Sequence, residues 1–177
     1  MKVEYYLLGF LMRYGRQHGY SLKETLGHQV SDFAKIKLPT IYYNLEKLEK
    51  QGYVTAAIEK EGNRPEKTVY EITDKGRQYF SYLTAEILKE KYEPEFILDG
   101  VLFFLEFTDI QQLIQSLEKR ESVLKAAIDA TERHRKTSLS HVPPDAVFLA
   151  KSIFEHHLSH MRAELAWTQS VLKGFDR

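Results

Sequence analysis

The chain has 177 residues, with 25 Lys and Arg against 25 Asp and Glu, and no cysteine. The lack of cysteine excludes disulfides, thiolate metal sites and cysteine nucleophiles. No apolar stretch approaches the ~18 residues of a membrane span, so we expect no membrane partner and a cytoplasmic location.

The charge is distributed unevenly along the chain. Residues 1–92 hold 15 Lys and Arg against 12 Asp and Glu, whereas residues 93–177 hold 10 against 13. This asymmetry is small and gives weak support for a basic N-terminal module. The predicted elements described below change to helix only beyond Pro94, so we expect two domains, 1–92 and 93–177, the second purely helical.

Two short helices are predicted first. Residues 3–15 have apolar side chains at helical spacing and end in glycine. Ser21 and Glu24 match a capping box, in which the serine accepts a hydrogen bond from the amide three residues on. A second helix over residues 22–28 is therefore expected.

A third helix is predicted over residues 38–51. Ile41, Leu45 and Leu48 recur at i, i+4 and i+7 and form one apolar stripe. Gly52 then stands where a glycine commonly ends a helix. The face opposite the stripe is polar and partly basic, with Pro39, Thr40, Tyr43, Glu46, Lys47 and Lys50.

A β-hairpin follows over residues 53–72, with a turn at Gly62-Asn63. Thr73 or Asp74 is expected to cap a further helix to about Tyr92. Three helices, a hairpin and a helix form a winged helix-turn-helix domain. The fold class is therefore mainly α with a small β-hairpin wing, followed by an all-α C-terminal domain.

The C-terminal part reads as helix only. Residues 95–107 are strongly apolar and are expected to be buried on most sides. Thr108 or Asp109 is expected to cap a helix to about Lys136, and a last helix is predicted over residues 145–172. Its apolar stripe favours a partner helix, and its candidate dimerisation residues are Val147, Phe154, Leu158, Met161, Leu165 and Leu172.

About the first 80 residues resemble the PadR family of transcriptional regulators in the order and spacing of several motifs. These are His18-Gly19-Tyr20, the run Leu38-Pro39-Thr40-Ile41-Tyr42-Tyr43-Asn44-Leu45-Glu46-Lys47-Leu48-Glu49, Gly52-Tyr53-Val54, Asn63-Arg64-Pro65 and Val69-Tyr70-Glu71-Ile72-Thr73-Asp74-Lys75-Gly76. The resemblance implies a DNA-binding regulator that dimerises through its C-terminal helices. It also suggests a small aromatic effector, such as a phenolic acid, that releases a repressor from a palindromic operator.

Candidate DNA contacts lie on the third helix and the wing. Base-edge or sugar contacts are expected from Thr40, Tyr43 and Asn44, and phosphate contacts from Tyr42, Lys47 and Lys50. The wing tip, at the minor groove or backbone, adds Lys60, Asn63, Arg64 and Lys67.

Other functions are open at this point. A near-zero net charge suits an adaptor that uses a winged helix only as a protein-binding scaffold. His156 and His160 lie one helical turn apart, with Glu164 continuing the row, but no metal or cofactor is expected. No glycine-rich phosphate loop or Gly-x-Ser-x-Gly motif is present, so the chain is not expected to be an enzyme. Trp167 and Phe103-Phe104 are candidates for an effector pocket, whose residues are unknown.

Overall fold

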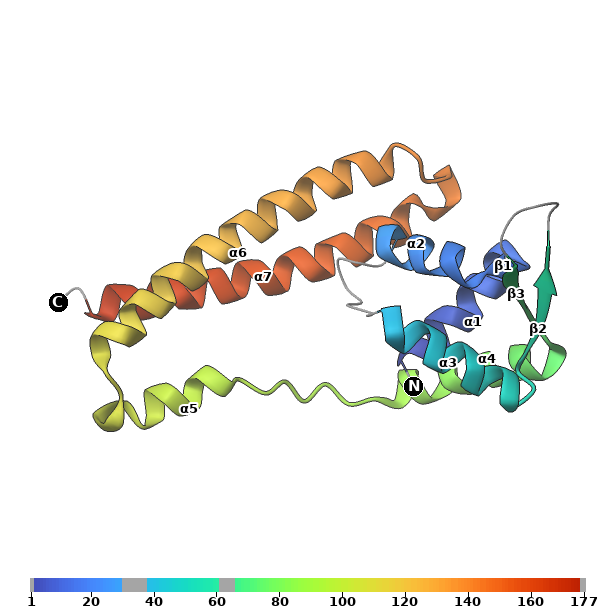
Figure 1. Ribbon diagram of the computed structural model, residues 1–177. Helices are drawn as coiled ribbons and strands as arrows, with labels where there is room; N and C mark the ends of the chain where they lie inside the picture. Colours follow the sequence, from blue (N-terminus) through green and yellow to red (C-terminus); the bar gives the residue numbers. More distant parts are fainter. Residues whose placement is uncertain (1, 30–37, 61–65, 176–177) are drawn as a thin grey trace. The chain divides into compact units, whose positions relative to one another are not determined.

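The computed structural model describes residues 2–29, 38–60 and 66–175. They form two compact units, Met1–Glu93 and Pro94–Arg177, each with its own secondary structure (Figure 1). None of the helices in the described ranges is apolar over the length needed to cross a membrane.

The N-terminal unit combines helices with a small antiparallel sheet. Its helices are α1 Lys2–Tyr14, α2 Gly19–Gln29, α3 Leu38–Lys50 and α4 Asp74–Lys89, and its strands are β1 Gln17–His18, β2 Val54–Glu59 and β3 Lys67–Ile72. The sheet order is β1-β3-β2, and Val54 pairs with Ile72 while Glu59 pairs with Lys67. The predicted winged helix-turn-helix order is confirmed.

The core of this unit lies between α1, α2, α3 and the sheet. Ile41, Leu45 and Leu48 are at most 1% exposed, which confirms the predicted stripe of the third helix. They meet Leu8 and Leu11 of α1 in the same apolar cluster. Burying a leucine stabilises the fold by about 1.5–3 kcal/mol. The buried inner face therefore anchors α3 in the core, and its outer face is left accessible for binding.

The end of α3 is joined to the start of α4. Gly52 has φ +74° and its amide donates to the Glu49 carbonyl, so it ends α3 as predicted. The Thr73 hydroxyl donates to the Gly52 carbonyl (2.8 Å) and accepts from the Gly76 amide (3.0 Å), which confirms Thr73 as the cap. A Cβ on Gly76 would lie 2.0 Å from the Tyr53 carbonyl oxygen, so only glycine fits there.

The prediction for the second helix was wrong in two respects. The helix begins at Gly19 rather than Leu22, and a two-residue strand, β1, precedes it. Gln17 and His18 pair with Tyr70 and Val69 of β3, which fixes the chain in extended form up to the helix start. Glu24 therefore makes no cap; its carboxylate accepts from the Tyr20 hydroxyl, and this hydrogen bond raises the pKa of Tyr20.

The C-terminal unit is helical throughout its described residues. It consists of α5 Ile97–Phe103, the 3-10 turns η1 Leu105–Phe107 and η2 Pro144–Ala146, and the long helices α6 Ile110–Leu139 and α7 Val147–Phe175. The Asp109 carboxylate accepts from the Gln111 and Gln112 amides, so the predicted cap of the long helix is confirmed.

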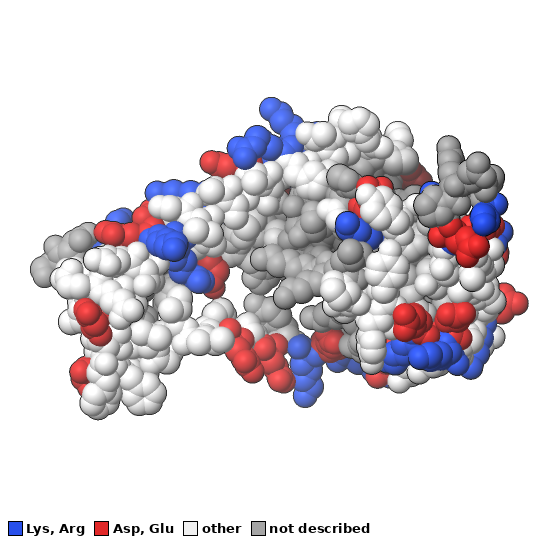
Figure 2. Space-filling model, viewed as in Figure 1, with Lys and Arg blue, Asp and Glu red and all other residues white. Residues whose placement is uncertain are grey.

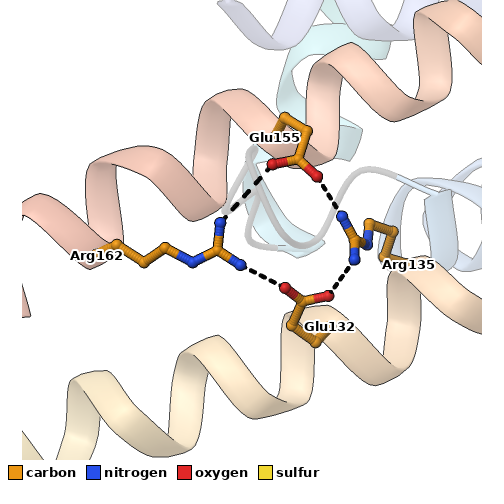
Figure 3. Close-up of polar contacts among 4 residues, drawn as sticks. All are labelled: Glu132, Arg135, Glu155 and Arg162. Atoms are coloured by element: carbon orange, nitrogen blue, oxygen red, sulfur yellow. Dashed lines mark hydrogen bonds and ion pairs between the residues drawn. The ribbon is translucent and has the colours of Figure 1, made fainter.

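Helices α6 and α7 form an antiparallel hairpin with polar contacts along its length. Arg120 of α6 contacts Glu164 of α7 at 2.5 Å. Arg162 also contacts Glu132 at 2.5 Å and Glu155 at 3.8 Å, and Arg135 contacts both Glu132 and Glu155, so the four side chains form a closed ring (Figure 3). Because these side chains are 30–50% exposed, each ion pair adds little stability, but the closed ring fixes the register of the two helices.

One prediction about burial in this unit was wrong. Residues 95–107 are not buried, since Ile97, Phe103 and Phe107 are 86%, 77% and 83% exposed. A two-helix hairpin has no third layer to cover a short segment at its end. Leu158, one of the predicted dimerisation residues, is 0% exposed within one copy and lies on the face of α7 that packs on α6, whereas the contact with a second copy stays a prediction.

Candidate nucleic-acid interface

The outer face of α3 carries most of the predicted contact residues. Thr40, Tyr43 and Lys50 are exposed, Tyr43 to 68%. An open hollow of about 310 Å³ lies on this face and is lined by Tyr43, Glu46, Lys47, Lys50 and Gln51. The helix thus presents an aromatic ring, a hydroxyl and a cation on one accessible face, which suits contact with base edges and phosphates.

Two predicted contacts are less accessible. Tyr42 is 39% exposed, at the edge of the apolar face. Asn44 is half-buried, and its side-chain amide donates to the Thr40 carbonyl at 2.7 Å within the same helix. Thr40 and Tyr43 are therefore the better placed of the predicted base contacts.

Lys47 makes a contact that sequence reasoning missed. Its ammonium donates to the Oε1 atom of Glu4 on α1 at 2.7 Å, and the Glu4 side chain is only 3% exposed. The Tyr79 hydroxyl of α4 donates to the other carboxylate oxygen at 3.3 Å. One carboxylate thus joins α1, α3 and α4 beneath the candidate interface.

The electrostatics of this cluster keep both partners charged. Burial alone would raise the pKa of Glu4, but the hydrogen bond and charge of Lys47, with the Tyr79 hydrogen bond, hold it below its ordinary value of 4.5. The hydrogen bond to Glu4 and its charge raise the pKa of Lys47. Burial and the neighbouring Glu4 raise the pKa of Tyr79. The Lys47 side chain is 45% exposed, so its ammonium is accessible from the hollow while it also donates a hydrogen bond to the buried Glu4 carboxylate.

One sequence signal pointed to this contact. Glu4 stands at i, i+4 and i+7 with Leu8 and Leu11, which are both buried on the inner face of α1. A carboxylate on an apolar face needs a cationic or hydrogen-bonding partner. The pattern indicates that Glu4 has a partner, but it does not show that this partner is Lys47, 43 residues away in the sequence.

The wing is partly described. Lys60 and Lys67 are exposed, and Lys60 lies 3.8 Å from Glu66. Asn63 and Arg64 lie outside the described residues. Sequence reasoning missed Arg16, whose guanidinium contacts Glu59 at the end of β2 at 2.9 Å and adds a half-exposed cation beside the wing.

Charge on the interface is mixed rather than uniformly basic. Glu46 and Glu49 alternate with Lys47 and Lys50 along the exposed part of α3. Figure 2 shows basic and acidic side chains next to one another over the N-terminal unit. Such a surface favours recognition by a few specific contacts over general attraction to phosphate.

The histidine row of α7 does not extend to a third ligand. The Nε2 atoms of His156 and His160 lie 3.2 Å apart, but Glu164 is occupied by Arg120. Within the described ranges, no group of three or more His, Cys, Asp or Glu side chains is placed to hold a metal ion. Phe103 and Phe104 meet edge to face and are more than half exposed, while Trp167 is half-buried on α7.

Comparison with known proteins identifies the family. Residues 7–82 match the model of the transcriptional regulator PadR-like family. Over residues 7–82 the N-terminal unit is therefore similar to the PadR-like family. This match confirms the predicted class, a DNA-binding transcription regulator rather than an enzyme.

The likeness to PadR-like proteins extends over both units. The chain is 25% identical to the negative transcriptional regulator PadR of Bacillus subtilis, over 99% of this chain and 98% of that one. The structure of B. subtilis PadR with operator DNA matches with a TM-score of 0.74, 22% identity and 98% coverage of both chains. Its complex with p-coumaric acid also matches at 0.74, with 20% identity and 99% coverage of both chains. The Vibrio cholerae virulence activator AphA matches at 0.78, with 16% identity and 98% coverage of both chains. These structures confirm the fold class of the whole chain.

Proposed function

We propose that this PadR-like chain is a repressor that binds a palindromic operator as a homodimer. The N-terminal unit reads DNA, and the C-terminal unit pairs the two copies and receives an effector. The observation that carries the proposal is the exposed outer face of α3, held from beneath by the buried core and by Glu4. A helix of this kind fits the major groove, and two-fold symmetry places two of them about one helical turn or a multiple apart.

Roles on the interface follow from exposure. Thr40 and Tyr43 contact base edges or sugar, and Lys50 contacts phosphate. Lys47 also contacts phosphate through its ammonium group, because its side chain is 45% exposed. Lys60, Lys67 and the wing-tip residues Asn63 and Arg64 contact the backbone or minor groove beside it.

The direct test is binding to the DNA upstream of the chain's own gene. We expect a specific complex in gel shifts whose affinity falls with salt, with a log–log slope of about −0.9 per phosphate neutralised. Tyr43→Ala weakens binding at least tenfold, and Lys50→Ala reduces the salt slope by about one. Tyr82→Ala and Lys89→Ala alter exposed residues of the same types on α4 and serve as matched controls. Unchanged affinity in both α3 variants would contradict the assignment of α3.

An effector of phenolic-acid class is part of the proposal. It is supported by B. subtilis PadR, which has been solved with p-coumaric acid and resembles the chain over nearly its whole length. An effector releases DNA if it favours a spacing of the two DNA-reading units that does not match the operator. We expect p-coumaric acid to raise the melting temperature of the protein and to weaken its complex with DNA. If no phenolic acid in a panel produces either effect, this class of effector is excluded.

A protein-binding adaptor is the second candidate. The acidic residues Glu46 and Glu49 beside Lys47 and Lys50 favour it, because they reduce attraction to phosphate. An adaptor predicts no specific DNA complex at either 50 or 200 mM salt, so the same gel shifts separate the two functions.

A further inference from the structure

Glu46 is an exposed carboxylate on the outer face of α3. It follows Tyr43 by three residues and precedes Lys50 by four, so the three side chains lie in one row on the helix surface. All three line the open hollow of this face. A partner that covers the outer face of α3 therefore meets Glu46 between an aromatic ring and a cation.

No side chain in the part of the chain that the structure describes neutralises this carboxylate. Glu46 makes no ion pair or hydrogen bond there, and the adjacent Lys47 donates instead to Glu4 on α1 at 2.7 Å. By contrast, Glu59 of the same unit contacts Arg16 at 2.9 Å. The negative charge of Glu46 is thus presented to whatever binds this face.

Such a charge is unfavourable beside DNA unless a base offers it a hydrogen-bond donor. Phosphates repel a carboxylate, just as they attract the cations on either side of it. In the major groove the donors are the amino groups of cytosine and adenine, N4 and N6. Guanine and thymine present only acceptor atoms on that edge, and these repel a carboxylate. A carboxylate in the groove therefore selects cytosine or adenine over guanine or thymine.

Cytosine fits a carboxylate better than adenine does. Adenine places the acceptor N7 next to its N6 amino group, so a carboxylate that accepts from N6 also meets an acceptor. Cytosine presents N4 without a neighbouring acceptor of its own. The preference of a glutamine is the opposite, because its amide accepts from N6 and donates to N7 of adenine. The exchange of a carboxylate for an amide should thus move the preference from cytosine to adenine.

We propose that Glu46 reads a cytosine in each operator half-site and is a specificity-determining residue of this chain. The inference rests on the proposed DNA-binding function and adds the identity of one base to it. Lys50 and the exposed part of Lys47 supply the attraction to phosphate that Glu46 reduces. Affinity then depends on the base at this position more than on general charge, in keeping with the alternation of Glu and Lys along α3.

Selection from a random double-stranded DNA library tests the assignment with the full chain. We expect the wild type to enrich a motif with one C·G pair in each half-site that Glu46→Gln changes to A·T. Glu46→Ala enriches the rest of the motif and has no preference at that pair. In gel shifts, every other base pair at this position weakens wild-type binding roughly 5- to 150-fold, the range for one mismatched pair.

Glu49→Gln is the matched control, because it removes the same charge from an exposed position of the same helix. Burial raises the pKa of Tyr70 on β3, and Glu49 adds more to this rise than Glu46, so Glu49 lies nearer to the sheet. We expect this variant to enrich the wild-type motif and to bind all sequences more tightly, since a charge that repels phosphate is lost. Circular dichroism checks that every variant is folded.

The outcomes separate this inference from the proposed function. If the wild type enriches a motif and both Glu46 variants enrich the same one, DNA binding stands and the reading of cytosine by Glu46 is overturned. The inference is also overturned if Glu46→Gln only binds all sequences more tightly, as the control does, or if the preference that it loses is for another base. If the wild type enriches no motif and forms no specific complex, the proposed function fails, and this inference fails with it.

Discussion

Replacing Lys47 separates its structural role from its proposed role in binding DNA. In Lys47→Met, the Glu4 side chain, which is 3% exposed, stays buried and loses its 2.7 Å hydrogen bond to Lys47. A buried polar group deprived of a partner costs about 1–3 kcal/mol. Because the Tyr79 hydroxyl still donates to Glu4, we expect the lower half of that range, about 1–2 kcal/mol.

The double variant Glu4→Gln/Lys47→Met shows whether the loss comes from the stranded carboxylate. Removing the charge together with its partner should recover most of the stability, since a neutral amide is cheaper to bury than an ion. Lys50→Met is the control, because it removes an exposed cation of the same helix. The assay is urea unfolding followed by circular dichroism, with operator binding measured on the same samples well below the unfolding midpoint.

The pattern of results decides between the roles. If Lys47 contacts phosphate, the double variant regains stability but not DNA affinity. If DNA affinity returns with stability, Lys47 acts only by positioning α3. A single Lys47→Met variant with unchanged urea midpoint and slope would refute the importance of the buried ion pair.

Further predictions concern the fold around the interface. Gly76→Ala forces a Cβ against the Tyr53 carbonyl oxygen and should destabilise the protein by about 1–3 kcal/mol, whereas Gly27→Ala, in open space on α2, should be neutral or stabilising in the same urea titration. Asp109→Ala removes the cap of α6 and should cost about 1 kcal/mol, while Asp129→Ala on the exposed face of that helix should cost little. The lowered pKa of Glu4 means that its contribution to stability is complete above its ordinary value of 4.5 and is lost as pH falls through the folded value. Stability measured by urea unfolding should therefore fall more steeply below pH 4.5 in the wild type than in Glu4→Gln, and parallel curves would contradict this.

Local signals in the sequence predicted the elements of the N-terminal unit well. The stripe Ile41, Leu45 and Leu48, the glycine after α3 and the cap at Thr73 each depend on residues within one or two helical turns. Such signals also placed the start of the long helix at Asp109. They identified the exposed face of α3 because the face opposite a buried stripe is known once the stripe is known.

What could not be predicted depends on partners distant in sequence. Glu4 and Lys47 are 43 residues apart in the sequence. Strand β1 forms only because Gln17 and His18 pair with the edge of β3. The exposure of Phe103 and Phe107 depends on which layer covers them, and periodicity cannot distinguish cover by the same chain from cover by a second copy. An apolar run predicts that a surface will be covered, but it does not name what covers it.

Helix α4 connects the candidate DNA-binding face of α3 to the rest of the chain. Its Tyr79 donates to Glu4, the partner of Lys47, and stacks at 4.1 Å on Tyr53, directly after the glycine that ends α3. The Lys75 ammonium donates to the Gln51 carbonyl at that same end. The covalent path from the C-terminal unit enters through α4, so a rotation of this helix acts on both the middle and the end of α3. Coupling between sites needs rigid, packed elements of this kind, and in the proposed dimer α4 would join the dimer geometry to the orientation of α3.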